Sequence, residues 1–334
     1  MEWIGRGSHG NPRPMASKSS PEKAEGPVVR AGTVAIIGRS NVGKSTLLNA
    51  ALALRLAAVS RRPQTTRTPL LGIVRHQGAE IGFLDTPGLH KADSKLGREM
   101  NRSARDALRD ADVVLFVVAL PPHVRGDVRA HPGDLALIEQ LPTDKPVVLI
   151  VNKIDVIRDK GLMLPLLAAL SAAREFTAVV PVSALTEQGI ELVLDEVAKL
   201  LPEGPARYAA DTLTDRPMRH FAAEYVREAV LRATSQEVPH AVAVTIDEYA
   251  EPSSDKEVTR ISATIHVERE GQKRILIGEK GTMLKRIGTE ARERVEELIG
   301  GRVHLAIWVR VTAGWRERSE SLADFGLLAR TEST

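Results

Sequence analysis

Six short apolar runs recur along roughly the first 200 residues of the chain and alternate mostly with segments of helical periodicity. Runs of this length, rich in Val and Ile, predict buried strands, and their alternation with helices predicts a doubly wound α/β sheet. Gln77-Gly78 separates the second run from the third and is typical of a hairpin turn, so we expect one antiparallel pair in a mixed sheet. The predicted strands cover residues 33–38, 70–75, 80–85, 112–118, 146–151 and 177–182.

The hydrophobic pattern changes after Pro217. A segment of helical period at 218–233 is followed by two runs in which every second residue is apolar. A later amphipathic helix begins after Gly281 and leads to a third alternating run. The expected order is therefore helix, strand, strand, helix, glycine turn, helix and strand, which is an α+β domain. The three strands are expected around 242–246, 261–267 and 303–311.

Segments rich in Gly, Pro and polar residues mark the expected domain boundaries. The first 29 residues lack an apolar stretch of signal-peptide length, so we expect a disordered arm there, with Met15 as an alternative start. Leu201-Pro-Glu-Gly-Pro205 contains helix-stopping residues, and the polar stretch after it has the composition of a linker. The expected division is an arm at 1–29, a first domain at 30–202, a linker at 203–216, a second domain at 217–318 and a tail at 319–334.

Composition narrows the classes of function. The chain has 334 residues, 43 % of them hydrophobic and 27 % charged, which is typical of a soluble protein of two domains. The absence of cysteine excludes disulfides, thiolate nucleophiles and cysteine metal sites, and it is compatible with a reducing cytoplasm. The longest apolar run, Val113 to Leu120, is far shorter than the roughly 20 residues of a membrane span. A net charge of +3 is weak support for nucleic-acid binding, so that function must rest on local features.

A phosphate-binding loop follows the first predicted strand. The stretch Gly38-Arg-Ser-Asn-Val-Gly-Lys-Ser45 fits the pattern G-x-x-x-x-G-K-[ST] and leads into a helix beginning near Lys44. The glycines let backbone N–H groups surround phosphate oxygens, and the helix N-terminus adds its positive dipole end. We expect Lys44 to meet the β- and γ-phosphates and the Ser45 hydroxyl to ligate magnesium. The predicted nucleotide-binding residues here are Gly38, Arg39, Ser40, Asn41, Val42, Gly43, Lys44, Ser45 and Thr46.

A second motif favours GTP over ATP. Asn152-Lys-Ile-Asp155 follows a buried-strand run and has the N-K-x-D pattern of GTPases. The Asp155 carboxylate can accept hydrogen bonds from guanine N1–H and the exocyclic amine at C2, whereas adenine has no proton on N1 and no amine at C2 and would leave the carboxylate unpaired. Asn152 and Lys153 are expected to brace the loop and to lie on the purine ring. After the next strand, the backbone of Ser183, Ala184 and Leu185 is expected to contact the guanine carbonyl.

The stretch Asp85-Thr-Pro-Gly88 ends the third run and has the Asp-x-x-Gly shape of a magnesium-sensing loop. We expect Asp85 to hold magnesium through a water and the Gly88 N–H to touch the γ-phosphate of the nucleotide. The next residue is Leu89, where many GTPases place a glutamine that orients the attacking water. Because the leucine side chain has neither donor nor acceptor, another group must stabilise the transition state.

A glycine loop separates two predicted helices of the second domain. Gly278-Glu-Lys-Gly281 has G-x-x-G spacing, and the order of elements around it resembles that of a type II KH domain, which is an RNA-binding fold. Such a loop lets a nucleic-acid backbone approach, and the N-terminus of the following helix offers N–H donors to phosphate. Lys285 and Arg286 can contact the RNA or can form an ordinary solvated helix face. The predicted RNA-binding residues are Ile277, Gly278, Glu279, Lys280, Gly281, Lys285 and Arg286.

Taken together, the motifs resemble the Era family of small GTPases. The strings NVGKSTLLNA, RPQTTR, DTPGLHK and NKID carry the resemblance in the first domain, and TDRP and IGTEAR extend it into the second. The resemblance implies a Ras-like P-loop GTPase domain with a mixed sheet, followed by a type II KH domain. It also implies that Thr66, rather than Thr65, closes over magnesium. The expected catalytic residues are then Lys44, Thr66 and Gly88, and the expected magnesium ligands are Ser45, Thr66 and Asp85.

The resemblance also indicates what replaces the missing glutamine. In Era-like GTPases with an asparagine in the phosphate-binding loop, a potassium ion is associated with the charge-neutralising role. The asparagine side chain and backbone carbonyls of the first switch coordinate this ion. Asn41 occupies the matching position. The alternative is that Asn41 only shapes the turn. We expect hydrolysis of GTP to GDP with a slow intrinsic rate that potassium stimulates. Two residues depart from the family pattern: Ser40, where Era proteins usually carry proline, and Glu279, whose carboxylate repels phosphate.

The expected partners also follow from the resemblance. It implies that the KH domain binds the 3′ end of 16S ribosomal RNA during maturation of the 30S subunit, with GTP favouring the RNA-competent arrangement. A cytoplasmic monomer is expected, and peripheral association with the inner face of the cytoplasmic membrane is left open. One rival is a signalling GTPase whose KH-like domain binds a protein. Another is a GTPase coupled to RNA modification, although no catalytic constellation outside the nucleotide site favours it.

Overall fold

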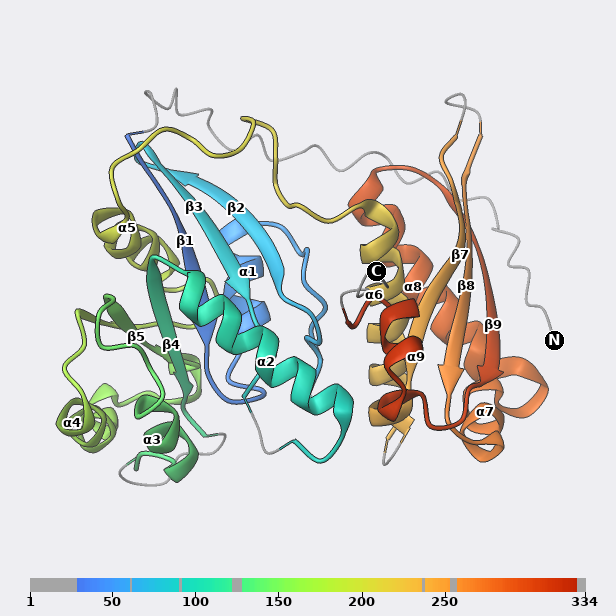
Figure 1. Cartoon of the computed structure of the whole chain (residues 1–334), viewed down its shortest axis with the longest axis horizontal. Helices are drawn as coiled ribbons and strands as arrows, with labels where there is room; N and C mark the ends of the chain where they lie inside the picture. Colours follow the sequence, from blue (N-terminus) through green and yellow to red (C-terminus); the bar gives the residue numbers. More distant parts are fainter. Residues whose placement is uncertain are drawn as a thin grey trace, which may run out of the picture. The chain divides into compact units, whose positions relative to one another are not determined.

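The computed structural model describes residues 29–60, 62–89, 92–121, 128–235, 238–252 and 257–328. Within these ranges the chain forms two compact units (Figure 1). The first unit contains Val29–Pro217 together with the segment from Gly314 onward, and the second contains Met218–Ala313. The predicted arm at 1–29 lies almost entirely outside the described residues, as does the end of the predicted tail from residue 329.

The first unit is built on a six-stranded sheet in the order β2-β3-β1-β4-β5-β6. Strand β2 runs antiparallel to β3, and the other neighbouring pairs are parallel. Gln77 and Gly78 form the turn between β2 and β3 with φ angles of +48° and +77°, which confirms the predicted hairpin. The strands are β1 (Arg30–Ile37), β2 (Leu70–His76), β3 (Ala79–Asp85), β4 (Val113–Ala119), β5 (Val147–Asn152) and β6 (Ala178–Pro181).

Helices cover both faces of this sheet, as a doubly wound fold requires. Figure 1 shows α2 in front of the sheet and α1 behind it. Helices α1 and α5 pack against each other, while α2, α3 and α4 contribute to one hydrophobic cluster with β1, β4 and β5. The central strands are buried on both sides, which explains why their sequences are continuous apolar runs. The helices are α1 (Lys44–Leu52), α2 (Lys95–Asp110), α3 (Pro132–Ile138), α4 (Leu164–Ala173) and α5 (Ile190–Leu200).

The predicted linker at 203–216 is irregular, but hydrogen bonds attach it to the first unit. The carboxylate of Glu80 on β3, which is 1 % exposed, accepts hydrogen bonds from the backbone N–H groups of Arg207 and Tyr208 at 2.6 and 3.2 Å. Further along, the Ile73 N–H donates to the Leu213 carbonyl at 2.9 Å, which covers part of the edge strand β2. The linker is therefore fixed to the first unit at several points rather than spanning free solvent.

The second unit has the predicted order of elements around the sheet β7-β8-β9. Strands β7 and β8 are antiparallel, β8 and β9 are parallel, and α6 packs against α8. A bulge between Ile246 and Glu248 lies just beyond the alternating run predicted at 242–246. The elements are α6 (Met218–Ala233), β7 (Ala243–Ala250), β8 (Thr259–Val267), α7 (Glu270–Ile277), α8 (Thr282–Ile299) and β9 (Val303–Val311).

The segment after β9 differs from its prediction. We expected the second domain to extend to residue 318, but the chain from Gly314 onward packs with the first unit. It forms a 3-10 turn over Trp315–Glu317 and helix α9 over Ser319–Asp324. Trp315 and Leu322 are both fully buried, so the large apolar side chains of this segment find their core in the first unit. That burial explains why the boundary falls earlier than the strand pattern alone indicated.

Candidate functional site

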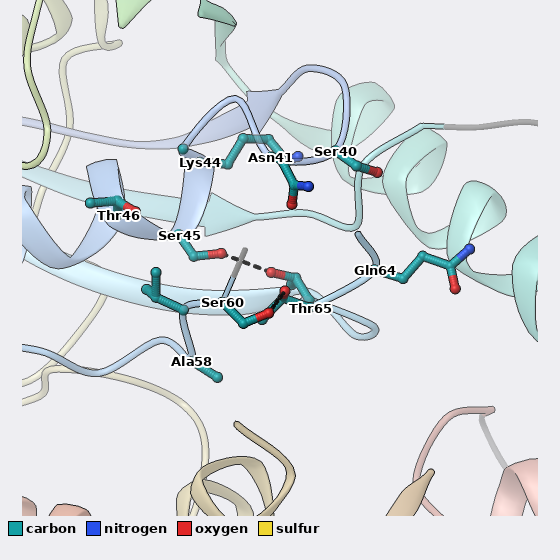
Figure 2. A pocket seen from close by; sticks show the side chains of 12 residues that line it. Ser40, Asn41, Lys44, Ser45, Thr46, Ala58, Ser60, Gln64 and Thr65 are labelled. Carbon is teal, nitrogen blue, oxygen red and sulfur yellow. Dashed lines mark hydrogen bonds between the residues drawn. The ribbon is translucent and has the colours of Figure 1, made fainter. Parts of the chain in front are cut away.

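The phosphate-binding loop joins β1 to α1 and lines a pocket beyond the carboxyl end of β1 (Figure 2). Loop residues between Ser40 and Thr46 form one side of this pocket, and residues between Ala58 and Thr66 form the other. Helix α1 begins at Lys44, as predicted, so its N-terminal N–H groups point toward the loop. Gly43 has a φ of +100°, and a Cβ there would lie 2.3 Å from Nδ2 of Asn152. A larger residue therefore cannot occupy this position without displacing the loop.

Lys44 is buried, with 6 % of its surface exposed. Its Nζ donates to the carbonyl oxygens of Gly38 and Arg39 at 3.2 and 3.1 Å. Burial lowers the pKa of Lys44 to about 8, and the nearby Asp85 carboxylate opposes that shift. Because an adjacent anion stabilises a buried cation, phosphate oxygens in the pocket would favour the charged form of Lys44 and would be bound by it in return.

Three oxygen-bearing side chains from separate segments meet beside Lys44. The Ser45 Oγ donates to Asp85 Oδ2 at 2.6 Å and lies 2.8 Å from the Thr66 Oγ1. The Thr66 Oγ1 donates to the same Asp85 oxygen at 3.0 Å. Asp85 is fully buried, and its second oxygen, Oδ1, has no hydrogen-bond partner among the described residues. Burial raises the pKa of this carboxyl, while Lys44 and the two hydroxyl groups lower it.

This cluster fits a magnesium ion. Hydroxyl and carboxylate oxygens are the ligands that magnesium prefers, and a cation would satisfy the buried Asp85 Oδ1. Thr65 has a different environment, because its Oγ1 donates to the Arg62 carbonyl at 2.8 Å and lies 2.9 Å from the Ser60 Oγ. The geometry thus favours Thr66 over its neighbour as the metal ligand. A single segment carries both threonines, but Thr66 is the one whose hydroxyl points into the cluster.

The predicted guanine-binding residues meet at the other end of the site. The Asn152 side chain links two loops, since its Nδ2 donates to the Val42 carbonyl at 2.8 Å and its Oδ1 accepts from the Ala184 N–H at 3.0 Å. Asp155 Oδ1 accepts from the Ser183 Oγ at 2.6 Å, which orients the carboxylate. Leu185 is 78 % exposed. The arrangement presents one oriented carboxylate at the rim of the site, as a guanine reader requires.

Lys153 and Asn41 connect the guanine end to the phosphate-binding loop. The Lys153 Nζ donates to the Asn41 carbonyl at 2.7 Å. Burial lowers the pKa of Lys153, Asp155 opposes the shift, and Arg39 reinforces it. Asn41 has a φ of +64°, and Figure 2 shows its side chain among those that line the pocket. The asparagine therefore shapes the turn and also presents an amide to the pocket, so both interpretations of this residue remain compatible with the structure.

Leu89 and Gly88 follow the buried Asp85 at the end of β3. Leu89 packs against the hydrophobic cluster that β1, β4 and β5 form with α2, α3 and α4, which accounts for an apolar residue at this position. A Cβ on Gly88 would lie 2.8 Å from the backbone nitrogen of Ser40, so the two loops approach closely. The structure therefore places the Gly88 backbone beside the phosphate-binding loop.

The glycine loop of the second unit is exposed. Gly278 ends α7, residues Glu279–Gly281 form one 3-10 turn, and α8 begins at Thr282. Gly281 has a φ of +82°, and a Cβ there would meet no described residue within 4 Å, so the position is open to an approaching chain. The side chains of Glu279, Lys280, Lys285 and Arg286 are exposed, whereas Ile277 and Gly278 are partly buried.

Comparison with known proteins identifies the family of each domain. Residues 33–153 match the family described as 50S ribosome-binding GTPase, and residues 237–316 match the KH domain. The GTPase Era of Syntrophus aciditrophicus is 45 % identical over 298 residues, which cover 89 % of this chain and 95 % of that protein. The GTPase Era of Xanthomonas campestris is also 45 % identical, covering 89 % and 97 %. The chain belongs to the GTPase Era family.

Solved Era structures match along nearly the whole chain. Era in complex with MgGDPNP and nucleotides 1506–1542 of 16S ribosomal RNA has a TM-score of 0.83 and 38 % identity, covering 90 % of this chain and 99 % of that one. A variant of Aquifex aeolicus Era bound to GDP·AlF4⁻ has the same TM-score and identity, covering 89 % and 99 %. Membership of the Era family makes the protein a GTP-binding GTPase with an RNA-binding KH domain, as the motifs predicted.

The Era site also contains a residue that the motifs did not reveal. Asp134 on α3 is 2 % exposed, and its Oδ1 accepts from the Arg39 Nε at 2.7 Å. This ion pair fixes the first variable position of the phosphate-binding loop to a neighbouring helix. Nothing in the local sequence around Asp134 distinguishes it from an ordinary residue near a helix start, so only the fold could identify the pair.

Proposed function

We propose that the protein is a magnesium-dependent GTP switch that binds the 3′ end of 16S ribosomal RNA and assists maturation of the 30S subunit. The observation that carries the proposal is the convergence of Ser45, Thr66 and Asp85 beside Lys44. An Era structure of 38 % identity holds both MgGDPNP and nucleotides 1506–1542 of 16S ribosomal RNA, which supports the same ligands here.

Hydrolysis depends on positioning and charge neutralisation. Phosphoryl transfer gains most from groups that fix the phosphates and neutralise developing charge. Lys44 would donate to the β- and γ-phosphate oxygens, and the Gly88 N–H would donate to the γ-phosphate. Magnesium, if held by Ser45, Thr66 and Asp85, would supply further positive charge to offset the charge that develops on the phosphate oxygens. Because Leu89 cannot orient water, this residue set alone gives slow intrinsic hydrolysis.

Potassium would supply the remaining charge. Asn41 lines the phosphate pocket, and a monovalent cation held by its side-chain oxygen would lie near the phosphates. The test compares single-turnover GTP hydrolysis in potassium and sodium buffers of equal ionic strength, for the wild type and Asn41→Ala. We expect faster hydrolysis in potassium for the wild type and equal rates for the variant. Equal rates in the wild type would remove potassium from the mechanism and leave Asn41 as a turn residue.

The RNA partner is tested by binding. A radiolabelled RNA oligonucleotide carrying the 3′ end of 16S ribosomal RNA is titrated with the full chain, in GDP and in the non-hydrolysable analogue GMPPNP, by filter binding. We expect tighter binding with GMPPNP, because γ-phosphate contacts at Thr66 and Gly88 would bias the switch. An absence of affinity in both nucleotide states would favour the rival in which the KH fold binds a protein.

Location and assembly state belong to the same proposal. We infer a cytoplasmic monomer whose basic KH residues Lys280, Lys285 and Arg286 can contribute to peripheral contact with an anionic membrane surface. In the part of the chain that the structure describes, no helix is long and apolar enough to cross a membrane. Flotation of the full chain with vesicles of anionic and neutral lipid tests the membrane contact, and sedimentation tests the monomer.

A further inference from the structure

The carboxy-terminal segment, Gly314–Leu328, packs on the first unit through apolar contacts. Trp315 and Leu322 are fully buried, and the rings of Trp315 and Phe325 meet edge to face with centroids 5.5 Å apart. This segment directly follows the last residue of the KH unit, Ala313. Residues that are attached to the RNA-binding half in sequence are therefore part of the GTPase half in structure.

Trp315 contacts the residue that follows the predicted magnesium ligand Thr66. The guanidinium of Arg67 lies 5.6 Å from the Trp315 ring centroid, and Arg67 is 4 % exposed. A buried guanidinium over an indole is a stabilising cation–π contact. Because Arg67 and Thr66 are consecutive, fixing the Arg67 side chain restrains the backbone that delivers the Thr66 hydroxyl to Ser45 and Asp85.

The carboxy-terminal segment also contacts helix α2, which follows the Asp85–Gly88 loop in the chain. The Lys95 N–H, at the start of α2, donates to Glu317 Oε2 at 3.1 Å. The Lys95 ammonium donates to the Ser319 hydroxyl. Arg98 lies 3.9 Å from the same Glu317 oxygen, but both side chains are largely exposed, so that ion pair contributes little. One segment thus contacts both parts of the chain that a γ-phosphate orders in GTPases.

Both connections to the KH unit contact the short segment that follows Thr66, at Arg67 and Pro69. The linker ends at Arg216, whose Nη2 donates to the Pro69 carbonyl at 3.1 Å. On the other side, the Thr312 N–H donates to the Val267 carbonyl of β8 at 2.7 Å, so the chain is still held in the KH unit only three residues before Trp315. A connection this short transmits displacement, because a few residues offer little slack.

We propose that Trp315 is a positioning residue of the nucleotide switch, which holds Thr66 in the magnesium-binding arrangement by stacking on Arg67. The triphosphate state and the position of β9 are then coupled through the carboxy-terminal segment. The inference rests on the proposed function, since the position of Thr66 matters only if the pocket takes magnesium and GTP. Trp315, which follows β9 in the chain, thereby influences which nucleotide the GTPase domain prefers.

The test measures the affinities of full-length wild-type and Trp315→Ala protein for fluorescent GDP and GMPPNP in magnesium buffer. We expect the variant to bind GMPPNP about tenfold or more weakly, because a desolvated cation–π contact is lost, and to bind GDP within about twofold of the wild type. Trp315→Phe keeps an aromatic face and should recover part of the GMPPNP affinity. Arg67→Ala should match Trp315→Ala, and the double variant should be no weaker than either single variant.

A matched control lies in the KH unit, where Arg294 stacks on Tyr225 at 5.1 Å. Arg294→Ala removes a contact of the same chemistry and should leave both nucleotide affinities unchanged. Unchanged affinities in Trp315→Ala, or equal losses for GDP and GMPPNP, would overturn the proposal and leave Trp315 a structural residue. If Trp315→Ala does not fold, the same measurement is made on Trp315→Phe and Arg67→Ala. A loss of affinity for GMPPNP that exceeds the loss for GDP supports the proposal, and equal or absent losses overturn it.

The coupling to RNA gives a second, independent measurement. If the Trp315 contact couples the nucleotide state to the KH unit, GMPPNP and RNA each change the affinity for the other by the same factor. The ratio of affinities for the 16S 3′-end oligonucleotide, with GMPPNP against GDP, should fall toward one in Trp315→Ala. A ratio equal to that of the wild type would contradict the coupling. Wild-type protein that binds neither nucleotide would contradict the proposed function itself, which is a different outcome from any change confined to Trp315.

Discussion

The nucleotide site and the glycine loop of the KH domain are built in opposite ways. Ser45, Thr66 and Asp85 come from three separate segments and are joined by hydrogen bonds of 2.6–3.0 Å around a fully buried carboxylate. The charged side chains at 279–286 come from one stretch of chain and are exposed. A buried cluster concentrates binding free energy in a few side chains, whereas an exposed loop distributes it over many weak contacts. Single substitutions should therefore have large effects in the first site and small ones in the second.

Lys44→Ala is expected to have the largest effect. Removing one partner of a buried charge pair costs about 2–5 kcal/mol, which is roughly a thirtyfold to several thousandfold loss of affinity for both GDP and GTP. Titration with fluorescent nucleotide measures it. Lys145→Ala is the control, because its Nζ also donates to backbone carbonyls, those of Leu108 and Ala111 at the carboxyl end of helix α2. Retained nucleotide affinity in Lys44→Ala would mean that the phosphates bind elsewhere.

Asp155→Asn should reduce the preference for guanine. Hydrogen bonds to a charged group contribute about 1.5–3 kcal/mol, so GTP affinity should fall roughly tenfold to 150-fold while ATP affinity stays the same. Competition between GTP and ATP for the fluorescent nucleotide measures the ratio. Asp159→Asn is a nearby control, because Asp159 accepts from the Gly161 N–H at a helix start. Undiminished GTP specificity in Asp155→Asn would place the base reader in another part of the chain.

The two neighbouring threonines, Thr65 and Thr66, test whether a hydroxyl must lie in the cluster with Ser45 and Asp85 to affect magnesium-dependent nucleotide binding. Thr66→Ala removes a hydroxyl from the predicted magnesium site. We expect the magnesium concentration needed for half-maximal GMPPNP binding to rise at least about tenfold. Thr65→Ala removes a hydroxyl that bonds within its own loop and should change this dependence little. Magnesium titrations of both variants give the comparison. Equal effects from the two substitutions would show that the loop, rather than the Thr66 hydroxyl, matters.

The same contrast explains how far the sequence could predict the molecule. The phosphate and guanine motifs can be recognised locally, because their glycines, lysine and carboxylates are required at fixed spacing. The order of strands and the hairpin at Gln77-Gly78 also follow from local pattern. Two contacts could not be predicted from local sequence: the ion pair of Arg39 with Asp134 and the stacking of Arg67 on Trp315. Their members are distant in sequence, and each is an ordinary residue in its own segment.

The exposed loop should show distributed effects. A lysine that contacts a phosphate of single-stranded RNA contributes about 0.7 to the slope of log affinity against log salt concentration. Lys280→Ala and Lys285→Ala should each reduce the slope by about that amount, with only a modest loss of affinity. Glu279→Gln should raise affinity roughly threefold at low salt, since a unit charge about 6 Å from a phosphate in water contributes about 0.7 kcal/mol. Glu293→Gln on α8 is the control. A large loss from one lysine would mean that the loop has a concentrated site.

The smallest effect is expected from a buried group that lies outside both sites. His266 on β8 is 6 % exposed, and its ring nitrogens lie 3.0 Å from the hydroxyls of Thr245 and Thr312. Burial lowers the pKa of His266, Arg310 lowers it further, and Asp247 opposes both. Because the folded chain disfavours the charged imidazole, the unfolded chain binds more protons as the pH falls below about 6.5. The stability that neutral His266 contributes should therefore be present above that pH and should be lost in more acidic buffer.

His266→Gln introduces an amide that can donate and accept hydrogen bonds but does not titrate. Between about pH 7.5 and pH 5.5, the free energy of unfolding should therefore fall less in this variant than in the wild type. Urea denaturation followed by circular dichroism measures both. RNA affinity should change equally with pH in the two proteins, because the predicted RNA contacts are exposed side chains of the glycine loop and His266 is buried. A pH dependence of RNA binding that disappears in His266→Gln would show that this buried group acts on the RNA site. RNA binding would then depend on buried as well as exposed residues.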